Sequence, residues 1–479
     1  MKSRRKNIIL LFLVIIPLLL IIAGYLGITL YFNSHFMFGS YINGTDYTGK
    51  TVGQAEQNMK KDIHNYTLEI AEREALTEYI QARDIGLDYV SDGSIQELLD
   101  RQNPFLWPAA YFRKENYEMA ATTIYDPDML RRAVENLDCF DEELVRRPVD
   151  ASYEYGEGSY RIVAEDIGDL LKYDEVYELV KAAVEQGDTR IDLEESDCYE
   201  KPVITQDYEP LVRLVDTLNR YVGITVTYDF IDRTEPLTGE QIKEWLVVED
   251  YEVSIDEKLV REYIDALSRK YNTFGKTREF ETWNGTLVTV KGGDYGWLIS
   301  RSVETEALID IIKAGKSVKR EPVYLQTAYC REENDIGSTY VEINLTAQHM
   351  WFFKDGECLV DTPVVTGNVS KDYGTPAGVY QITYKERNAT LNGEDYSTPV
   401  SYWMPFYYNV GIHDAPWRNK FGGEIYKKSG SHGCVNTPPD NARIIYENIE
   451  AKVPVVVYKK KLRQEVIDQL NGIKDETRQ

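Results

Sequence analysis

Residues 431–436 read Ser-His-Gly-Cys-Val-Asn, and residues 412–414, a short distance upstream, read Ile-His-Asp. These stretches put Cys434 close in sequence to His413 and His432, two of only five histidines in the chain. A thiol with the ordinary pKa of about 8.5 is only a few per cent thiolate at neutral pH, so an imidazole that takes its proton makes it a nucleophile. The sequence therefore predicts acyl transfer by a cysteine.

The residues that follow this motif predict a favourable setting for a thiolate. Residues 436–440 read Asn-Thr-Pro-Pro-Asp, a pattern typical of a turn that opens a helix. Near a helix N-terminus the dipole and the backbone N–H groups lower a thiol's pKa and can form an oxyanion hole. We expect Cys434 to benefit from both effects.

The motif lies in a region of short alternating strands. Residues 340–345 and 350–353 alternate or run apolar, and Lys354-Asp355-Gly356-Glu357 between two such runs predicts a hairpin turn. A helix near 440–449 and a strand at 453–458 close this region. We expect a mostly β, sandwich-like domain over residues 337–458, followed by a polar tail at 459–479.

The preceding 300 residues show a repeated pattern in which a β-rich segment with Asp-x-Gly precedes an amphipathic helix. The Asp-x-Gly copies lie at residues 84–86, 166–168 and 294–296. A calcium loop is disfavoured because the further ligands of such loops are absent, so Asp as a cap and Gly at positive φ explain the pattern better. The sequence predicts α+β modules at residues 40–205 and 206–330, and an α+β fold class for the chain.

An apolar run near the N-terminus predicts a membrane helix. Residues 8–32 contain no charged side chain and are long enough to cross a hydrocarbon core of about 30 Å. Basic residues in the first seven positions predict a cytoplasmic N-terminus at residues 1–7 and an extracellular remainder. A cleaved signal peptide is the alternative, which the length of the run and the lack of a cleavage pattern disfavour.

Charge and cysteine content exclude several functions. The net charge of −25 comes without a basic stripe, which argues against nucleic acid as a partner. Five cysteines cannot all be paired within the chain, and Cys434 is the one expected to be free. The other four, Cys139, Cys198, Cys330 and Cys358, allow three pairings but are better explained as small apolar side chains. Their spacing predicts neither a metal site nor a cofactor.

Residues 337–458 resemble the catalytic domain of the L,D-transpeptidases, the YkuD domain. The family signature is a histidine, a gap of somewhat under twenty residues, and Ser/Thr-His-Gly-Cys; here seventeen residues separate His413 from Ser431. Residues 364–367 and 375–380 resemble two further segments of the family. Many members have arginine two residues after the cysteine, whereas this chain has Asn436, as a second group of the family does. Residues of about 45–330 resemble, less specifically, the peptidoglycan-binding repeats that precede this domain in some cell-surface members.

The resemblance implies a role for each residue of the motif. It implies Cys434 as the nucleophile and His413 as its base, with His432 as the alternative base. Asp414 takes the place of the residue that orients the base, and we expect its backbone carbonyl to do so. Ser431, Gly433 and Asn436 are implied to shape the substrate and oxyanion pocket, and the following aromatic residues could line a groove or belong to the core: Tyr396, Trp403, Tyr407, Tyr408 and Trp417.

The activity implied is that of a membrane-anchored L,D-transpeptidase on the cell-wall side, without metal or cofactor. Such an enzyme forms 3→3 cross-links between donor and acceptor stem peptides of peptidoglycan, and releases the terminal D-alanine of a tetrapeptide stem. Carbapenem β-lactams are expected inhibitors. An L,D-carboxypeptidase, and a non-catalytic scaffold that binds peptidoglycan, are the alternatives.

Overall fold

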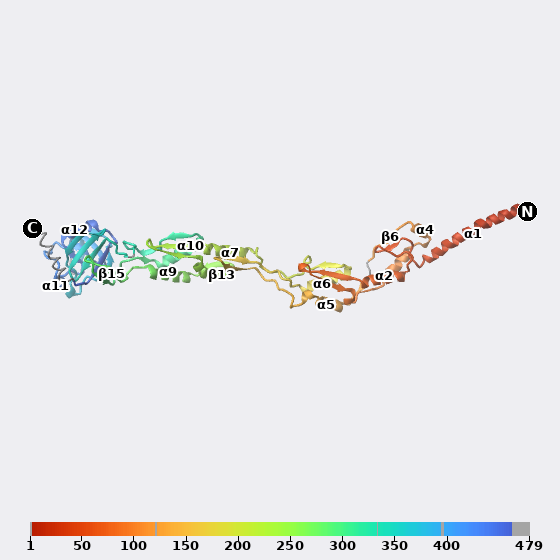
Figure 1. Ribbon diagram of the computed structural model, residues 1–479, viewed down its shortest axis with the longest axis horizontal. Coiled ribbons are helices and arrows are strands. Elements are labelled where there is room, and N and C mark those ends of the chain that lie inside the picture. The colour runs from red at the N-terminus through yellow and green to blue at the C-terminus, as the bar shows by residue number, and fades with distance from the viewer. Residues whose placement is uncertain (1, 120–121, 333, 394–396, 462–479) are drawn as a thin grey trace. The chain divides into compact units, whose positions relative to one another are not determined.

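The structure, a computed structural model, describes residues 2–119, 122–332, 334–393 and 397–461. Residues 462–479, most of the expected polar tail, and Tyr396 lie outside this range. The chain divides into two compact units, residues 1–152 with 162–208 and residues 153–161 with 209–479. Both units mix helices and strands (Figure 1), so the predicted α+β class is confirmed.

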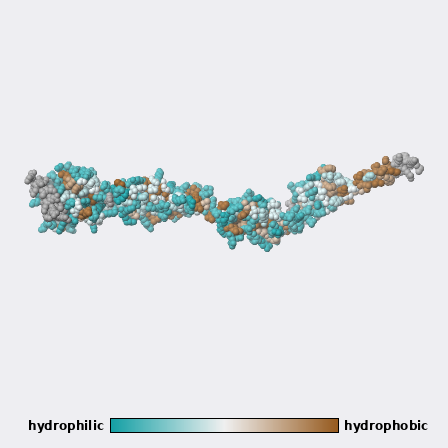
Figure 2. Space-filling view, viewed as in Figure 1, coloured by the Kyte–Doolittle hydropathy of each residue, from teal (hydrophilic) through white to brown (hydrophobic). Residues whose placement is uncertain are grey.

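Helix α1 (Lys2–Tyr31) is the apolar N-terminal segment. The most apolar 18-residue window within Ile9–Tyr31 has a mean hydropathy of 3.0 and contains no buried residue. Figure 2 shows this helix as an apolar surface. By length and composition the helix could cross a membrane, and a signal sequence passes the same test.

The first unit packs short sheets against amphipathic helices. One sheet has the order β2-β1-β6 and another the order β10-β3-β4, and β5 pairs with β7. Leu68 and Ile70 of β3 are fully buried, together with Val176 and Val180 of α6. The elements are β1 Ser40–Ile42, β2 Thr45–Asp46, α2 Val52–His64, β3 Thr67–Ala71, η1 Arg73–Ala75, β4 Thr77–Gln81, η2 Ala82–Asp84, β5 Asp88–Tyr89, α3 Ser94–Arg101, η3 Pro104–Leu106, α4 Trp107–Ala110, β6 Glu115–Tyr117, β7 Thr123–Ile124, α5 Pro127–Glu135, η4 Asp138–Phe140, α6 Tyr173–Gln186 and β10 Arg190–Asp192. The hairpin β8 Ser152–Gly156 and β9 Ser159–Val163 contains residues of both units.

The second unit begins with a module of the same kind. Helix α7 buries Leu211, Leu214, Val215 and Leu218, the i, i+3, i+4, i+7 spacing of an apolar helix face. Its sheet has the order β12-β11-β18. The elements are α7 Glu209–Val222, β11 Val226–Asp229, β12 Thr234–Leu237, α8 Gly239–Ile242, η5 Lys243–Trp245, β13 Leu246–Glu249, β14 Glu252–Ile255, α9 Glu257–Tyr271, β15 Arg278–Glu281, β16 Leu287–Val290, β17 Leu298–Ile299, α10 Arg301–Ala314, β18 Val318–Arg320 and β19 Tyr324–Gln326.

The rest of the second unit is a β-sandwich. A five-stranded sheet, β22-β21-β20-β28-β23, and a four-stranded sheet, β24-β25-β26-β27, contribute to one core. Helix α12 contacts β22, β25 and β26. The elements are β20 Tyr340–Asn344, β21 His349–Lys354, β22 Glu357–Pro363, η6 Val369–Lys371, β23 Gly378–Gln381, β24 Glu386–Asn392, β25 Ser397–Tyr407, β26 Val410–Asp414, α11 Tyr426–Ser429, β27 Val435–Thr437, α12 Pro439–Asn448 and β28 Pro454–Tyr458. The sandwich predicted from the alternating strands is confirmed.

The Asp-x-Gly pattern marks turns. Gly86, Gly168 and Gly296 all have positive φ, at +65°, +57° and +131°. At Gly168 a Cβ atom would lie 2.5 Å from the carbonyl oxygen of Arg146, so the turn also needs the absence of a side chain. The predicted role of glycine in these turns is confirmed.

A buried carboxyl joins the module to the sandwich within the second unit. Glu342 of β20 is fully buried and accepts hydrogen bonds from the N–H of Trp283 (2.9 Å) and the hydroxyl of Tyr458 (2.5 Å). The Trp283 ring stacks on Trp351 of β21, with 5.0 Å between ring centroids. The loop between β15 and β16 is therefore anchored to the five-stranded sheet.

Glu342→Gln should change how stability depends on pH. Burial raises the pKa of Glu342 from 4.5 to about 7, so the folded state favours the protonated carboxyl. The protonated carboxyl contributes fully to the free energy of unfolding below about pH 4.5. This contribution, on the order of 3 kcal/mol, is lost as the pH rises through 7. Calorimetry of the full chain in detergent should show a Tm for the second unit that falls from pH 5 to 8, and falls less in the variant.

Glu357→Gln, an exposed substitution in β22, is the matched control and should leave the pH dependence unchanged. If the Tm of the second unit fell equally with pH in wild type and Glu342→Gln, Glu342 would not be the group with the raised pKa.

Candidate active site

Parallel pairing of two strands brings the two motifs together. In the register of β26 and β27, Ile412 lies opposite Val435 and His413 lies opposite Asn436. Side chains alternate between the two faces of a strand. His413, Asn436 and Cys434, which immediately precedes β27, therefore share one face of the four-stranded sheet.

Trp403 forms part of the surroundings of Cys434. It lies opposite His413 in the antiparallel pairing of β25 and β26, and its ring centroid is 6.1 Å from that of His413. Cys434 packs in one apolar cluster with Trp403, Ala389 and Val400. Gly411 permits this arrangement, because a Cβ there would lie 2.6 Å from the Trp403 ring. Trp403, an aromatic residue predicted to line a groove or belong to the core, thus lies in the same apolar cluster as Cys434.

Cys434 is a buried thiol with only 7% of its surface exposed. Its Sγ donates a hydrogen bond to the carbonyl of Asn409, at 3.4 Å. Burial raises the pKa of Cys434 to about 11, and backbone N–H groups of Gly411 and Cys434 itself offset part of this effect. The expected lowering of the pKa by a helix N-terminus is wrong, because β27 intervenes and α12 begins only at Pro439.

His413 is held by the backbone of the next residue. Its Nδ1 lies 2.7 Å from the carbonyl oxygen of Asp414. Since a carbonyl only accepts, Nδ1 carries the proton and Nε2 is left with a lone pair. The carboxylate of Asp414 accepts instead from the N–H of Tyr402, at 2.8 Å. The contact to His413 is therefore made by the carbonyl, as expected, and the carboxylate has a structural partner in β25.

Burial favours the uncharged forms of Cys434 and His413. His413 is 4% exposed, and burial lowers its pKa, with an added contribution from the positive charge of Arg418. A raised thiol pKa and a lowered imidazole pKa both oppose a thiolate–imidazolium pair. Burial therefore favours an uncharged Cys434 thiol and an uncharged His413 imidazole at neutral pH.

His432 has a different environment from His413. It is exposed, and its ring packs against Tyr373 with 4.7 Å between centroids. The two candidate bases are therefore distinguished by burial, because His413 lies beside Cys434 on the sheet face whereas His432 lies at the surface.

A small hydrogen-bond network holds the loop before Cys434. Ser431 Oγ donates to the carbonyl of Cys434 and accepts from the N–H of Gly433. Thr375 Oγ1 donates to the carbonyl of Gly433 (2.6 Å) and accepts from the N–H of Gly367 (2.9 Å). Gly433 itself has φ +124°, a conformation that favours glycine. Ser431 and Gly433 thus shape the loop, and the role of Thr375 was not predicted.

Asn436 is buried and has an unsatisfied acceptor. It is 2% exposed, and its side-chain Oδ1 has no hydrogen-bond partner among the described residues. A buried amide oxygen without a partner is costly, so this atom is available to a ligand. It lies on the same face as Cys434 and His413.

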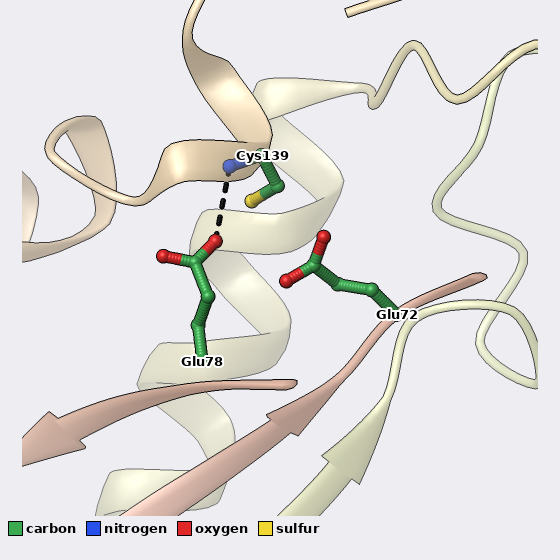
Figure 3. A group of neighbouring side chains, drawn as sticks. All are labelled: Glu72, Glu78 and Cys139. Atoms are coloured by element: carbon green, nitrogen blue, oxygen red, sulfur yellow. Dashed lines mark hydrogen bonds between the residues drawn. The ribbon is translucent and has the colours of Figure 1, made fainter. Parts of the chain in front are cut away.

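A second group of reactive side chains lies in the first unit. Figure 3 shows Glu72, Glu78 and Cys139, whose ligand atoms lie within 4.8 Å of one another. Glu78 accepts from the N–H groups of Asp138 (2.8 Å) and Cys139 (3.0 Å), which caps η4. Burial, with the neighbouring charge of Glu78, raises the pKa of Glu72 to about 7, and burial also raises the pKa of Cys139. The raised pKa keeps Cys139 protonated at neutral pH, and the group of Glu72, Glu78 and Cys139 contains no histidine.

All five cysteines are described and all are free. Cys198 is buried, as expected for a small apolar side chain, whereas Cys358 is exposed, so that interpretation is wrong for Cys358. Exposure follows from its place at the edge of the five-stranded sheet, in β22.

Comparison with protein families identifies both parts of the second unit. The YkuD family, described as "L,D-transpeptidase catalytic domain", matches residues 338–457. The family described as "Putative peptidoglycan binding domain" matches residues 217–319.

The chain is also similar in sequence to L,D-transpeptidases of known structure and to curated relatives. A cysteine-to-serine mutant of Enterococcus faecium L,D-transpeptidase is 36% identical over 51% of this chain and 100% of its own, with a TM-score of 0.44. The catalytic domain of the E. faecium enzyme acylated by ertapenem is 43% identical over 26% of this chain and 98% of its own, with a TM-score of 0.24. L,D-transpeptidase 1 of Mycobacterium tuberculosis is 26% identical over 24% of this chain, which spans about half (48%) of that relative.

Alkylation of Cys434 should rise steeply in the alkaline range. Since burial raises the pKa of this thiol to about 11, the thiolate fraction at pH 7 is small and grows about tenfold per pH unit. Mass spectrometry of the Cys434 peptide after timed exposure to iodoacetamide between pH 6 and 10.5 measures this rate. An alkylation rate that stops rising below pH 8.5 would show a preformed thiolate and contradict the raised pKa of Cys434.

Thr375→Val should destabilise the loop before Cys434. The substitution keeps the shape but leaves the N–H of Gly367 and the carbonyl of Gly433 without their partner, at a cost of about 1–3 kcal/mol. Thr375→Ser keeps the hydroxyl and is the matched control. Equal unfolding free energies for the two variants in urea titrations would exclude this role.

Proposed function

The chain belongs to the L,D-transpeptidases with a YkuD catalytic domain, and we propose that it cross-links peptidoglycan stem peptides through an acyl-enzyme on Cys434. The observation that carries the proposal is the shared sheet face of Cys434 and His413, with the Nε2 of His413 unprotonated. A buried thiol beside a fixed base is the arrangement that nucleophilic catalysis by cysteine requires.

The first step forms a thioester. His413 Nε2 takes the thiol proton while Sγ attacks the carbonyl carbon of the third residue of a tetrapeptide stem. The tetrahedral intermediate collapses, the bond to the D-alanine nitrogen breaks, and the imidazolium returns the proton to that nitrogen. In this proposal the oxyanion would form near the backbone N–H of Cys434, and the buried Asn436 would line the pocket wall.

The second step transfers the acyl group to an amine. The side-chain amine of the third residue of another stem attacks the thioester, gives its proton to His413, and displaces the Cys434 thiolate, which is reprotonated. The product is a 3→3 cross-link. Neither step needs a metal or an organic cofactor, because the leaving group and the nucleophile are both activated by proton transfer.

Water is the competing nucleophile, and its success would make the protein an L,D-carboxypeptidase. The burial of Cys434 against Trp403, Ala389 and Val400 favours the amine. An apolar wall around the thioester limits the access of bulk water. A non-catalytic scaffold is disfavoured because Cys434 and His413 are both present and share one face of the four-stranded sheet.

The remaining parts fit a cell-wall enzyme. Helix α1 would anchor the chain with residues 1–7 in the cytoplasm, and the modules between it and the sandwich would hold the catalytic domain near its polymeric substrate. Carbapenems are proposed inhibitors that acylate Cys434, as ertapenem acylates the E. faecium catalytic domain.

The reaction is tested by mass spectrometry of the full chain in detergent, incubated with disaccharide-tetrapeptide. We expect loss of D-alanine and a dimer joined through two third residues, with both products absent for Cys434→Ala. Release of D-alanine without a dimer would indicate an L,D-carboxypeptidase. No release from stems that contain either lysine or diaminopimelate would favour the non-catalytic scaffold.

The two histidines provide an internal control. His413→Ala should slow acylation by about 10²–10⁴-fold, the usual contribution of a general base, whereas the exposed His432 should matter less. If His432→Ala slowed acylation more than His413→Ala did, His432 would be the base instead of His413.

A further inference from the structure

Among the residues that the structure describes, Arg418 has no counterion, although the protein is acidic. The chain has 79 acidic and 54 basic residues. In the part of the chain that the structure describes, the Arg418 side chain has no ion pair or hydrogen bond, and its buried Nε has no acceptor. The side chain is half-buried, and this burial lowers its pKa. A buried N–H group with no acceptor is costly, so a ligand that accepts a hydrogen bond from the Arg418 Nε would offset this cost.

The position of Arg418 relates it to the active site. The turn after β26 closes with a hydrogen bond from the N–H of Arg418 to the carbonyl of Ala415, at 3.0 Å. The N–H of Ala415 in turn donates to the carbonyl of Thr437, at 3.0 Å, so the turn is tied to β27. The ring of Trp417 lies 5.9 Å from that of His413. Arg418 is also near enough to His413 for its charge to lower the imidazole pKa.

In the proposed reaction the leaving group carries a carboxylate, which would lie near His413. In the proposed reaction His413 gives its proton to the nitrogen of the departing D-alanine, so this nitrogen lies beside the imidazole. The D-alanine carboxylate is attached to the Cα next to that nitrogen, which puts its carbon about 2.5 Å away. A cation on the His413 side of the site would therefore meet the carboxylate of a C-terminal residue.

We propose that Arg418 binds the C-terminal carboxylate of the donor stem and so restricts the enzyme to a terminal D-amino acid. The inference rests on the proposed function and adds the determinant of its donor specificity. A guanidinium suits this role because its planar fork of donors matches a carboxylate in a bidentate geometry. An internal peptide bond has no carboxylate at this position and would leave Arg418 unpaired.

The test compares two donors on the full chain in detergent: a tetrapeptide that ends in a free carboxylate and the same peptide that ends in a carboxamide. For wild type we expect KM for D-alanine or D-alaninamide release to be about 10- to 100-fold higher with the carboxamide, the range of a charge-assisted hydrogen bond. Arg418→Gln should raise KM for the acid donor by a similar factor and leave the amide donor unchanged. Arg418→Lys should fall between the two.

Lys420→Gln is the control, because it removes an exposed cation two residues away and should change neither KM. Equal KM values of wild type for the two donors would overturn the inference while leaving the transpeptidase intact, and this comparison needs no variant. An equal rise in KM for both donors in Arg418→Gln would also overturn the inference, because a purely structural role of Arg418 would affect the two donors alike. If wild type releases nothing from either donor although Cys434 is still alkylated, the proposed function and the inference both fail.

Discussion

The parallel pairing of β26 with β27 is the constraint on which the site depends. Its register sets His413 opposite Asn436 and so puts Cys434, His413 and Asn436 on one face. A shift by one residue would turn one set of side chains to the opposite face, because the period of a strand is two. The hydrogen bonds from Ser431 and Thr375 hold the loop that delivers Cys434 to this register.

Burial decides the electrostatics of the pair more than any neighbouring charge does. It raises the pKa of Cys434 and lowers that of His413, so the uncharged forms are favoured in the resting site. The backbone carbonyl of Asp414 fixes the tautomer of His413, while the Asp414 carboxylate accepts a hydrogen bond from the N–H of Tyr402. A site of this kind keeps its nucleophile protonated until a substrate changes the environment of the sulfur.

The same sandwich is joined to the module before it by buried polar contacts. Glu342 accepts from Trp283 of the module and from Tyr458 of β28, and Trp283 stacks on Trp351. A buried acid with two donors and a large stacked aromatic pair make a specific contact. The peptidoglycan-binding module and the catalytic domain of the second unit are thus joined by defined side chains.

The sequence alone determined much of this protein, because local patterns carry local structure. Alternating strands predicted the sandwich, the Asp-x-Gly pattern predicted turns with glycine at positive φ, and the Ser-His-Gly-Cys motif with His413 identified the candidate site. The pKa of Cys434 could not be predicted in the same way, since a few residues of sequence suggested a helix N-terminus where the fold has a strand. Trp403, Thr375 and Arg418 acquire their roles from strand register, hydrogen bonds across the fold and burial. These features depend on residues distant in sequence, so only the tertiary structure decided which groups surround the thiol and which charge near His413 has no partner among the described residues.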